Sequence, residues 1–179
     1  DQAGALFVQE GTGSFSRRNA EFFEKDKDSE DTDCTFFDAN GDGKQDLYVT
    51  SGGSEFSSSS TSLIDRLYLN VGNGQLKKGQ QLLPVQTKFE STSTVVSNDY
   101  DGDGDIDLFV GTRLVPFLYG APANGYILNN DGKGNFLDVT HSVALELLQL
   151  GLITDAKWAD VNNDGKADLL VVGEWMSIK

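Results

Sequence analysis

The chain has 179 residues, enough to bury one ordinary hydrophobic core, and its hydrophobic fraction of 38% is not that of a disordered chain. It carries 28 acidic and 14 basic residues, and this formal net charge of −14 argues against nucleic acid or an anionic membrane as a partner, because both would repel it. No apolar run approaches the roughly 20 residues that a membrane-spanning helix needs.

The chain begins with a pattern typical of a β-hairpin. Residues 6–8 are a short apolar run, and residues 11–13 supply a glycine-rich turn before Phe15. The pattern returns at residues 67–76 and 126–136, and its last glycines, at positions 13, 74 and 134, are almost evenly spaced. No helix is expected after these turns, so hairpins are favoured over phosphate-binding loops.

The single cysteine, Cys34, stands between an acidic run over residues 21–33 and strand-like residues 35–37. The acidic run is interpreted as a solvated loop. Cys34 is expected at a half-buried strand position rather than as a functional thiol. One cysteine can form neither an intrachain disulfide nor a cysteine zinc site, so cysteine usage leaves the cellular compartment open.

An aspartate-rich loop of nine residues follows and then recurs twice. Residues 38–46, 99–107 and 160–168 align without gaps, their starts are evenly spaced and define a constant repeat period, and each runs into a short apolar stretch. With the hairpin, each period holds about four strands, which is the signature of a β-propeller blade. The expected fold class is all-β: blades of four antiparallel strands in a partial propeller, about three blades' worth of a larger ring.

The loops have the spacing of a calcium site. Calcium takes six to eight oxygens at about 2.3–2.6 Å, which side chains at positions 1, 3, 5 and 9 and a backbone carbonyl at position 7 can supply, with glycine at position 6 for the sharp turn. The predicted ligands are Asp38, Asn40, Asp42, Lys44 and Asp46; Asp99, Asp101, Asp103, Asp105 and Asp107; and Asp160, Asn162, Asp164, Lys166 and Asp168. Three bound calcium ions would change the formal net charge from −14 to −8.

Plain acidic turns, EF-hands and magnesium sites are less favoured. Aspartate, asparagine and glycine favour turns in any protein, but three acidic copies in register repel themselves without a cation. An EF-hand needs glutamate at position 12 and flanking helices, whereas position 12 here is Val49, Val110 and Val171. Magnesium prefers a small octahedral shell with retained waters.

Later residues suggest no catalytic chemistry. His141 follows a hairpin and is expected to be a surface or hydrogen-bonded structural histidine. Residues 143–150 are rich in leucine and form either a short helix or a buried loop. Trp158 and Trp175 flank the third loop and are expected to pack between blades.

Taken together, these motifs resemble the FG-GAP/VCBS repeat, the calcium-loop blade of integrin α-subunit propellers. The pattern D-x-[DN]-x-D-G-x-x-D-L-x-V is followed by an L-Y-x-N-x-G-x-G-x-F hairpin, and residues 120–122 match the Gly-Ala-Pro of the integrin version once. Residues 67–70 and 173–176 look more like bacterial ASPIC/UnbV-like VCBS proteins. The resemblance implies that each loop joins the innermost strand of a blade to the second.

By this resemblance, the whole of residues 1–179 is a partial propeller. Residues 1–33 supply the outer strands of an incomplete blade, residues 34–93 and 94–155 are whole blades, and residues 156–179 supply the inner strands of another incomplete blade. Because closed propellers have four to eight blades, the chain is expected either to be a segment of a longer propeller or to associate through its open edges.

Two functions are carried forward. The first is a calcium-stabilised, non-catalytic scaffold that binds a protein or glycan at the cell surface, outside the cell or in the periplasm, as in cell adhesion. The alternative is a part of, or an accessory domain to, a secreted polysaccharide-active enzyme, for which the acidic run at residues 21–33 offers spare carboxylates. No catalytic residue and no cofactor besides calcium is predicted, and neither nucleic acid nor membrane insertion is expected.

Overall fold

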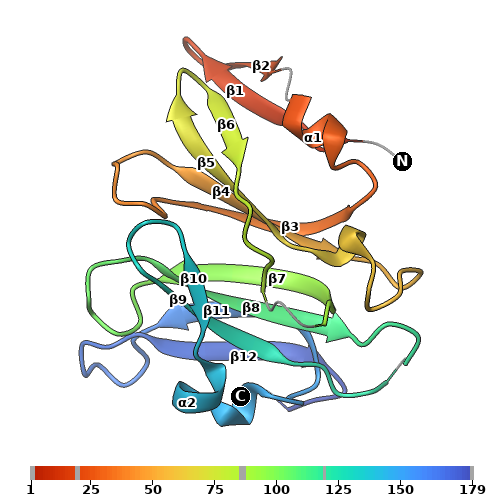
Figure 1. Ribbon diagram of the computed structural model, residues 1–179. Helices are drawn as coiled ribbons and strands as arrows, with labels where there is room; N and C mark the ends of the chain where they lie inside the picture. Colours follow the sequence, from red (N-terminus) through yellow and green to blue (C-terminus); the bar gives the residue numbers. More distant parts are fainter. Residues whose placement is uncertain (1–2, 19–20, 85–87, 119, 178–179) are drawn as a thin grey trace.

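Four antiparallel sheets follow one another along the chain and stack in a curved array (Figure 1). The computed structural model describes residues 3–18, 21–84, 88–118 and 120–177. Two sheets have four strands and two have two strands, and the strand order in each four-stranded sheet follows the chain. The predicted all-β class, with sheets of the propeller-blade type, is confirmed.

The strands are β1 (Leu6–Glu10), β2 (Ser14–Arg18), β3 (Glu30–Phe37), β4 (Asp46–Gly52), β5 (Arg66–Gly72), β6 (Gln75–Lys78), β7 (Ser91–Asn98), β8 (Asp107–Leu114), β9 (Gly125–Asn130), β10 (Phe136–Asp138), β11 (Leu152–Ala159) and β12 (Asp168–Glu174). The helical segments are α1 (Glu21–Lys25), η1 (Thr61–Leu63), α2 (Thr140–Val143) and η2 (Leu145–Leu147). In the described ranges no helix has the length and hydrophobicity to cross a bilayer.

The central strands β4 and β8 are buried on both faces. Every residue of β4 is buried, which is why residues 47–49 are a continuous apolar run and do not alternate with polar residues. Tyr48 packs between the two four-stranded sheets, whereas Leu47 and Val49 pack on the opposite face with Phe23 of α1. Each four-stranded sheet therefore contributes to two layers of core.

The cores lie between successive sheets. Phe37 and Leu67 of the first four-stranded sheet pack against Leu108 and Val110 of the second. The second sheet in turn packs through Phe109 and Ile127 against Ile153 of β11 in the last sheet. These clusters join neighbours in the stack, as face-to-face packing of sheets requires.

The first strands of successive sheets also contact one another directly. Thr32 of β3 donates a hydrogen bond from Oγ1 to the carbonyl oxygen of Thr92 on β7 (2.9 Å), and Ser93 of β7 donates from Oγ to the carbonyl oxygen of Ile153 on β11 (2.6 Å). In each of these two hydrogen bonds, the donor and the acceptor residue are 60 positions apart in sequence. The repeat period is therefore also close to the spacing of the contacts between sheets.

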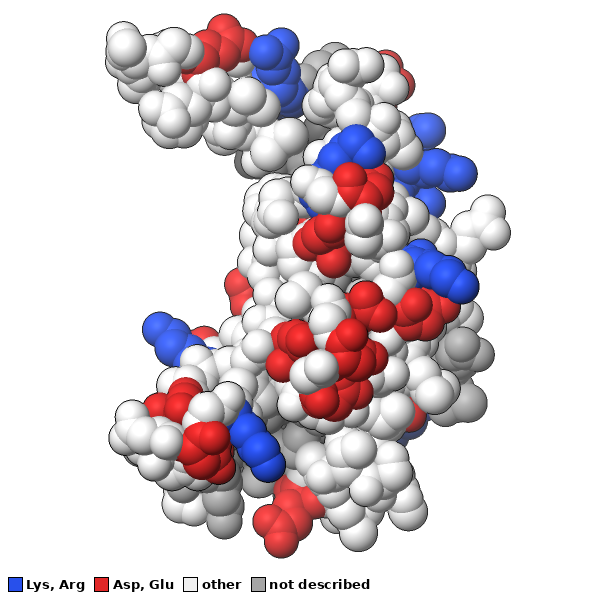
Figure 2. Space-filling view, turned by 90° about the vertical axis from the view of Figure 1, so that its left-hand side faces the viewer, with Lys and Arg blue, Asp and Glu red and all other residues white. Residues whose placement is uncertain are grey.

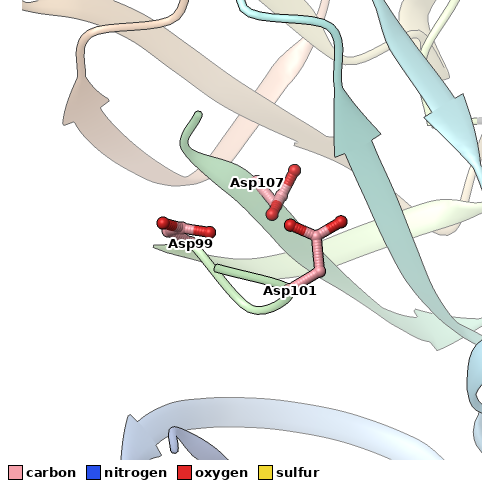
Figure 3. A group of neighbouring side chains, drawn as sticks. All are labelled: Asp99, Asp101 and Asp107. Carbon is pink, nitrogen blue, oxygen red and sulfur yellow. The ribbon is translucent and has the colours of Figure 1, made fainter. Parts of the chain in front are cut away.

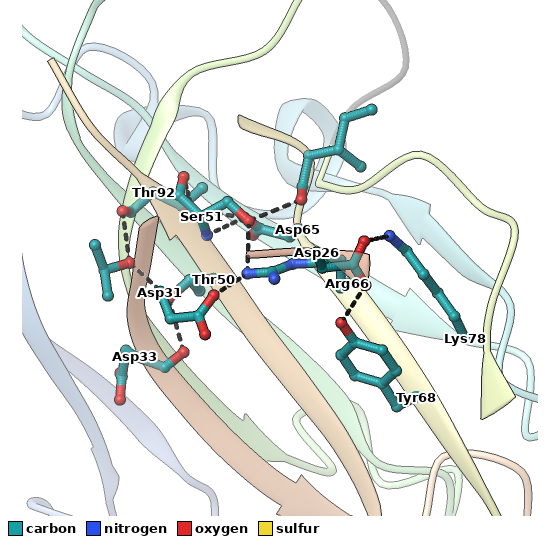
Figure 4. A network of polar contacts seen from close by, with 12 residues as sticks. Asp26, Asp31, Asp33, Thr50, Ser51, Asp65, Arg66, Tyr68, Lys78 and Thr92 are labelled. Carbon is teal, nitrogen blue, oxygen red and sulfur yellow. Dashed lines mark hydrogen bonds and ion pairs between the residues drawn. The ribbon is translucent and has the colours of Figure 1, made fainter. Parts of the chain in front are cut away.

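A buried polar network ties the first four-stranded sheet to β7 (Figure 4). Asp65 is 1% exposed and accepts hydrogen bonds from the Thr92 hydroxyl (2.6 Å), the Ser51 backbone N–H (2.8 Å) and the Tyr48 hydroxyl (3.0 Å). The neighbouring Arg66 is also buried and forms an ion pair with Asp31. The three donors to Asp65 come from β4 and β7, so the carboxylate joins two sheets.

Two sequence expectations are wrong and one is refined. Cys34 lies on β3 as predicted but is exposed, since it lies outside the cluster in which Phe23 of α1 packs on the outer face of the sheet with Leu47 and Val49. Trp175 is 74% exposed and lies in a turn after β12, where the chain leaves the sheet. The segment at residues 143–150 contains part of α2 and all of η2, so it is made of short helical turns rather than a buried loop.

Candidate metal centre

The three aspartate-rich loops connect the first and second strands of three sheets: β3 to β4, β7 to β8 and β11 to β12. They lie on one side of the molecule, at the left of Figure 1, and acidic side chains gather on that face in Figure 2. Because the sheets repeat, three loops far apart in sequence are presented in the same direction.

The middle loop gathers three carboxylates (Figure 3). One oxygen from each of Asp99, Asp101 and Asp107 lies within 4.8 Å of the other two. Asp107 is 1% exposed at the start of β8, whereas Asp101 is exposed. Two unit charges at this separation repel by about 1 kcal/mol in water and by about 3–4 kcal/mol at the effective dielectric constant of a protein surface. A cation in the cluster would relieve that repulsion.

Backbone amides hold the first aspartate of each loop. In the middle loop, Asp99 Oδ1 accepts from the N–H groups of Gly102 (2.8 Å) and Asp103 (3.1 Å), and Oδ2 accepts from Gly104 N–H (3.0 Å). Asp38 accepts from the equivalent Gly43 N–H (2.7 Å), and Asp160 accepts from Gly165 N–H (2.9 Å).

The glycine at position 6 is required in each loop. The φ angles of Gly43, Gly104 and Gly165 are +79°, +96° and +83°, the left-handed region that favours glycine. The sequence pattern therefore gives the same backbone turn three times.

The last aspartate of the first two loops reaches across to the third strand of its sheet. Asp46 Oδ1 accepts from Asn70 N–H (2.6 Å), and Asp107 Oδ1 accepts from Asn130 N–H (2.8 Å). Burial, with the charges of Asp101 and Asp103 adding to it, raises the pKa of Asp107 to about 6. Burial likewise raises the pKa of Asp46. Asp168, in the third loop, accepts from Val161 N–H within its own loop (3.0 Å).

The remaining predicted ligands differ between loops. The middle loop has aspartate at position 3, whereas Asn40 and Asn162 stand there in the first and third loops. In all three loops the position-3 side chain accepts from the N–H of the position-5 aspartate. Asp42 forms an ion pair with Lys44 Nζ (2.7 Å). Among the described residues, the middle loop is therefore where three carboxylates converge, and Asp103 stands outside that group.

Asn129 was missed as a site residue by sequence reasoning. Its Nδ2 donates to Asp101 Oδ2 (3.1 Å) and to Asp107 Oδ1 (3.4 Å). The sequence showed Asn129 only as a hairpin residue matching Asn70. In the structure the residue equivalent to Asn70 is Asn130, because Asn70 and Asn130 each donate their backbone N–H to the last aspartate of the loop in their own sheet. The glycines at positions 13, 74 and 134 depart from even spacing by a single position, and this was the available signal.

Asn130 links the first loop to the second. It is 2% exposed, and its Nδ2 donates to the carbonyl oxygens of Ala39 (2.9 Å), in the first loop, and of Ile106 (3.0 Å), in the second. We expect Asn130→Ala to lower the free energy of unfolding by roughly 2–3 kcal/mol, because one buried and one partly buried carbonyl lose their donor. Denaturant unfolding measures this.

Asn70→Ala is the matched control. Asn70 occupies the same position one sheet earlier, but its Nδ2 donates to Gln45 O in the loop of its own sheet, in an exposed contact (3.1 Å). Its loss is expected to cost less than about 1 kcal/mol. Equal losses in the two variants would contradict the bridging role of Asn130.

The donor set suits a hard cation. The clustered side chains offer carboxylate oxygens and include no thiolate or imidazole, which matches calcium or magnesium rather than zinc or copper. Hydrogen bonds already orient Asp99 and Asp107, and each carboxylate has more lone pairs than the bonds described above use. The residues present therefore fit a calcium ion.

Comparison with protein families gives a match over most of the chain. The model of the FG-GAP-like repeat matches residues 38–110 and again residues 99–171. Each match starts at the first aspartate of one loop and extends past the next loop into the strand that follows it. A search among curated proteins finds no match.

Proposed function

Because the chain belongs to the FG-GAP-like repeat family, we propose that it is a calcium-stabilised β-propeller segment that acts outside the cytoplasm as a non-catalytic scaffold for a protein or glycan ligand. The supporting observation is the convergence of Asp99, Asp101 and Asp107 in a loop whose pattern occurs three times. Calcium-binding modules outside cells bind at about 10⁻⁴–10⁻³ M, where the ion is abundant.

The proposed role of calcium is structural. In the middle loop, Asp99, Asp101 and Asp107 would hold the ion, with Asp103 and the Asp105 carbonyl as further candidate ligands. The equivalent residues of the first and third loops are the proposed ligands there. When bound, the ion would supply positive charge among carboxylates that otherwise repel each other. The chain's own contribution is to orient Asp99 through backbone amides and to anchor Asp107 on β8.

Calcium is expected to raise the melting temperature of the protein. For a dissociation constant of about 0.1–1 mM, about 10 mM calcium adds about 1.4–2.7 kcal/mol to the free energy of unfolding for each occupied site. Calorimetry in calcium and in chelator, at matched ionic strength, measures the shift, and magnesium at the same concentration tests selectivity. An unchanged melting temperature would show that calcium does not stabilise the fold.

The absence of catalysis is part of the proposal. His141 lies on α2 and is exposed, on a different connection from the aspartate loops. Assays on a panel of polysaccharides, run beside direct binding measurements, distinguish the two functions. Binding without turnover supports the scaffold, whereas cleavage that persists in a highly purified preparation would overturn it in favour of the polysaccharide-active alternative.

A further inference from the structure

The turn between β9 and β10 contacts the first aspartate loop, which belongs to the preceding sheet. A Cβ atom on Gly41 of that loop would lie 3.6 Å from the carbonyl oxygen of Gly132 in the turn. The hairpin is also held on its other strand, because Phe136 donates its N–H to Gln81 Oε1 (2.9 Å) and accepts a hydrogen bond from Gln81 Nε2. The rings of Phe136 and Phe37 pack edge to face with their centroids 6.1 Å apart. The hairpin is therefore fixed against the sheet that carries the first loop.

Asn130, at the end of β9, contacts two loops with one side chain. It is 2% exposed, and its Nδ2 donates to the carbonyl oxygen of Ala39 (2.9 Å) in the first loop and to that of Ile106 (3.0 Å) in the second. Its Oδ1 accepts from Gly132 N–H (3.2 Å) in the hairpin turn. Both N–H groups of the amide and its oxygen are thus used, which fixes the orientation of the side chain between the two loops.

These bonds form a continuous relay between two proposed calcium ligands. In the first loop, Ala39 N–H donates to Asp46 Oδ2 (2.9 Å), and the Ala39 carbonyl accepts from the Asn130 side chain. In the second loop, the backbone N–H of Asn130 donates to Asp107 Oδ1 (2.8 Å). All four residues are buried. The last aspartate of the first loop is therefore joined to the last aspartate of the second through one peptide group and one side chain.

The relay makes the order of one loop depend on the order of the other. The bond between Asn130 and Ala39 has its observed geometry only while Asp46 holds Ala39 and Asp107 holds Asn130. A calcium ion that orders one loop places one end of this bond, so the other loop loses less freedom when it binds its own ion. By thermodynamic linkage, each ion then raises the affinity of the other loop by the same factor.

We infer that calcium binding to the first and second loops is positively coupled, with Asn130 as the positioning residue that joins the two sites. This inference rests on the proposed function and adds that the two ions act together across the boundary between two sheets. One hydrogen bond contributes a factor of about five to an equilibrium constant, so disabling either loop is expected to weaken calcium binding at the other about fivefold. Repulsion between the ions opposes this coupling, and salt at about 0.15 M screens it beyond about 8 Å.

Calcium binding can be followed at each loop separately by NMR. The backbone N–H groups of Gly43 and Gly104 each donate to the first aspartate of their own loop, so their signals report the two sites. Asp101→Ala removes an exposed carboxylate of the middle cluster and should abolish the response of Gly104. The calcium concentration that half-saturates the Gly43 signal should then rise about fivefold. Asp42→Ala, in the first loop, should weaken the response of Gly104 by the same factor.

Asp105→Ala is the matched control for charge. It removes a carboxylate from the same loop as Asp101→Ala, at a position where only the backbone carbonyl is a proposed ligand. The response of Gly104 should persist, and half-saturation at Gly43 should stay close to the wild-type value. This comparison leaves Asn130 in place, so it tests the coupling without disturbing the contact between sheets.

Asn130→Ala tests the route of the coupling. In this background, Asp101→Ala should no longer change the half-saturation of Gly43, because the bridge is already absent. Asn70→Ala is the matched variant, since Asn70 Nδ2 donates to Gln45 O in the loop of its own sheet, and it should leave the coupling intact.

The possible outcomes separate this inference from the function on which it rests. Calcium responses at both glycines with the same half-saturation of Gly43 in wild type and in Asp101→Ala would overturn the coupling and leave calcium stabilisation standing. A weakening that Asp105→Ala reproduces would also overturn it, because the charge of the loop would then be the cause. No calcium response at either glycine would instead overturn the proposed function.

Discussion

Asp107→Ala is expected to lower the free energy of unfolding by about 3–5 kcal/mol and to abolish the calcium response of the middle loop. Asp107 is buried and accepts N–H groups from Asn130 and Tyr100. Its loss leaves both donors without a partner, and hydrogen bonds to a charged group are worth about 1.5–3 kcal/mol each. Relief of repulsion from Asp99 and Asp101 offsets part of the cost.

Urea unfolding of Asp107→Ala, in calcium and in chelator, separates the two effects. Asp105→Ala is the matched control, because it removes a carboxylate from the same loop at a position where only the backbone carbonyl is a proposed ligand. It is expected to cost less than about 1 kcal/mol, a surface-type change, and to keep the calcium response. If the two variants lose calcium stabilisation equally, the charge of the loop and not the position of Asp107 determines binding.

Asp65→Ala is expected to destabilise the fold by about 3–4 kcal/mol. The substitution removes the acceptor of three buried donors, on Thr92, Ser51 and Tyr48, and each unsatisfied donor costs about 1–3 kcal/mol before the protein relaxes. Part of this destabilisation is offset, because the substitution also removes a buried carboxylate that is costly to ionise. Denaturant unfolding at neutral pH measures the net effect.

Asp65→Asn tests the charge separately from the hydrogen bonds. The amide oxygen can keep the bonds from Thr92 and Ser51 while its NH₂ donates to the Tyr48 hydroxyl, which can act as donor or acceptor. Burial raises the pKa of Asp65 to about 7. The folded protein therefore holds this proton more tightly than the unfolded chain, so the contribution of Asp65 to stability is full below about pH 4 and is lost as pH rises to about 7.

Wild-type stability relative to Asp65→Asn should thus fall across this range, by at most about 4 kcal/mol, since one unit of pKa is worth about 1.4 kcal/mol. The comparison of the two proteins removes the contribution of the remaining acidic groups. Parallel pH profiles for wild type and Asp65→Asn would show that the carboxyl ionises in the fold as it does in the unfolded chain.

The sequence was most informative where structure is local. The loops and the strands beside them depend on residues within a short window, such as Asp99 and the N–H of Gly104 five positions later, so pattern alone predicted them. The repeat then predicted the sheets, because copies of one local pattern form the same structural unit and stack on one another.

Contacts between sheets left no comparable signal in the sequence. Asn130 reaches Ala39 across 91 residues, and the hydrogen bonds of Asp65 depend on β4 and β7 meeting at one place. The stretch from Asp107 to Asn130 spans 23 residues and that from Asp46 to Asn70 spans 24, and this one-residue difference moved the equivalence from Asn129 to Asn130. The exposure of Cys34 likewise depends on which surface faces it, and strand propensity carries no information about that.

The contacts between β3, β7 and β11 have a kinetic consequence. Each connects partners about one repeat period apart, however many sheets the array contains. Adding sheets therefore lengthens the chain without lengthening the loops that must close, and the relative contact order falls as the array grows. Folding can begin at any sheet and spread to its neighbours, so that each added sheet is ordered on a surface already formed.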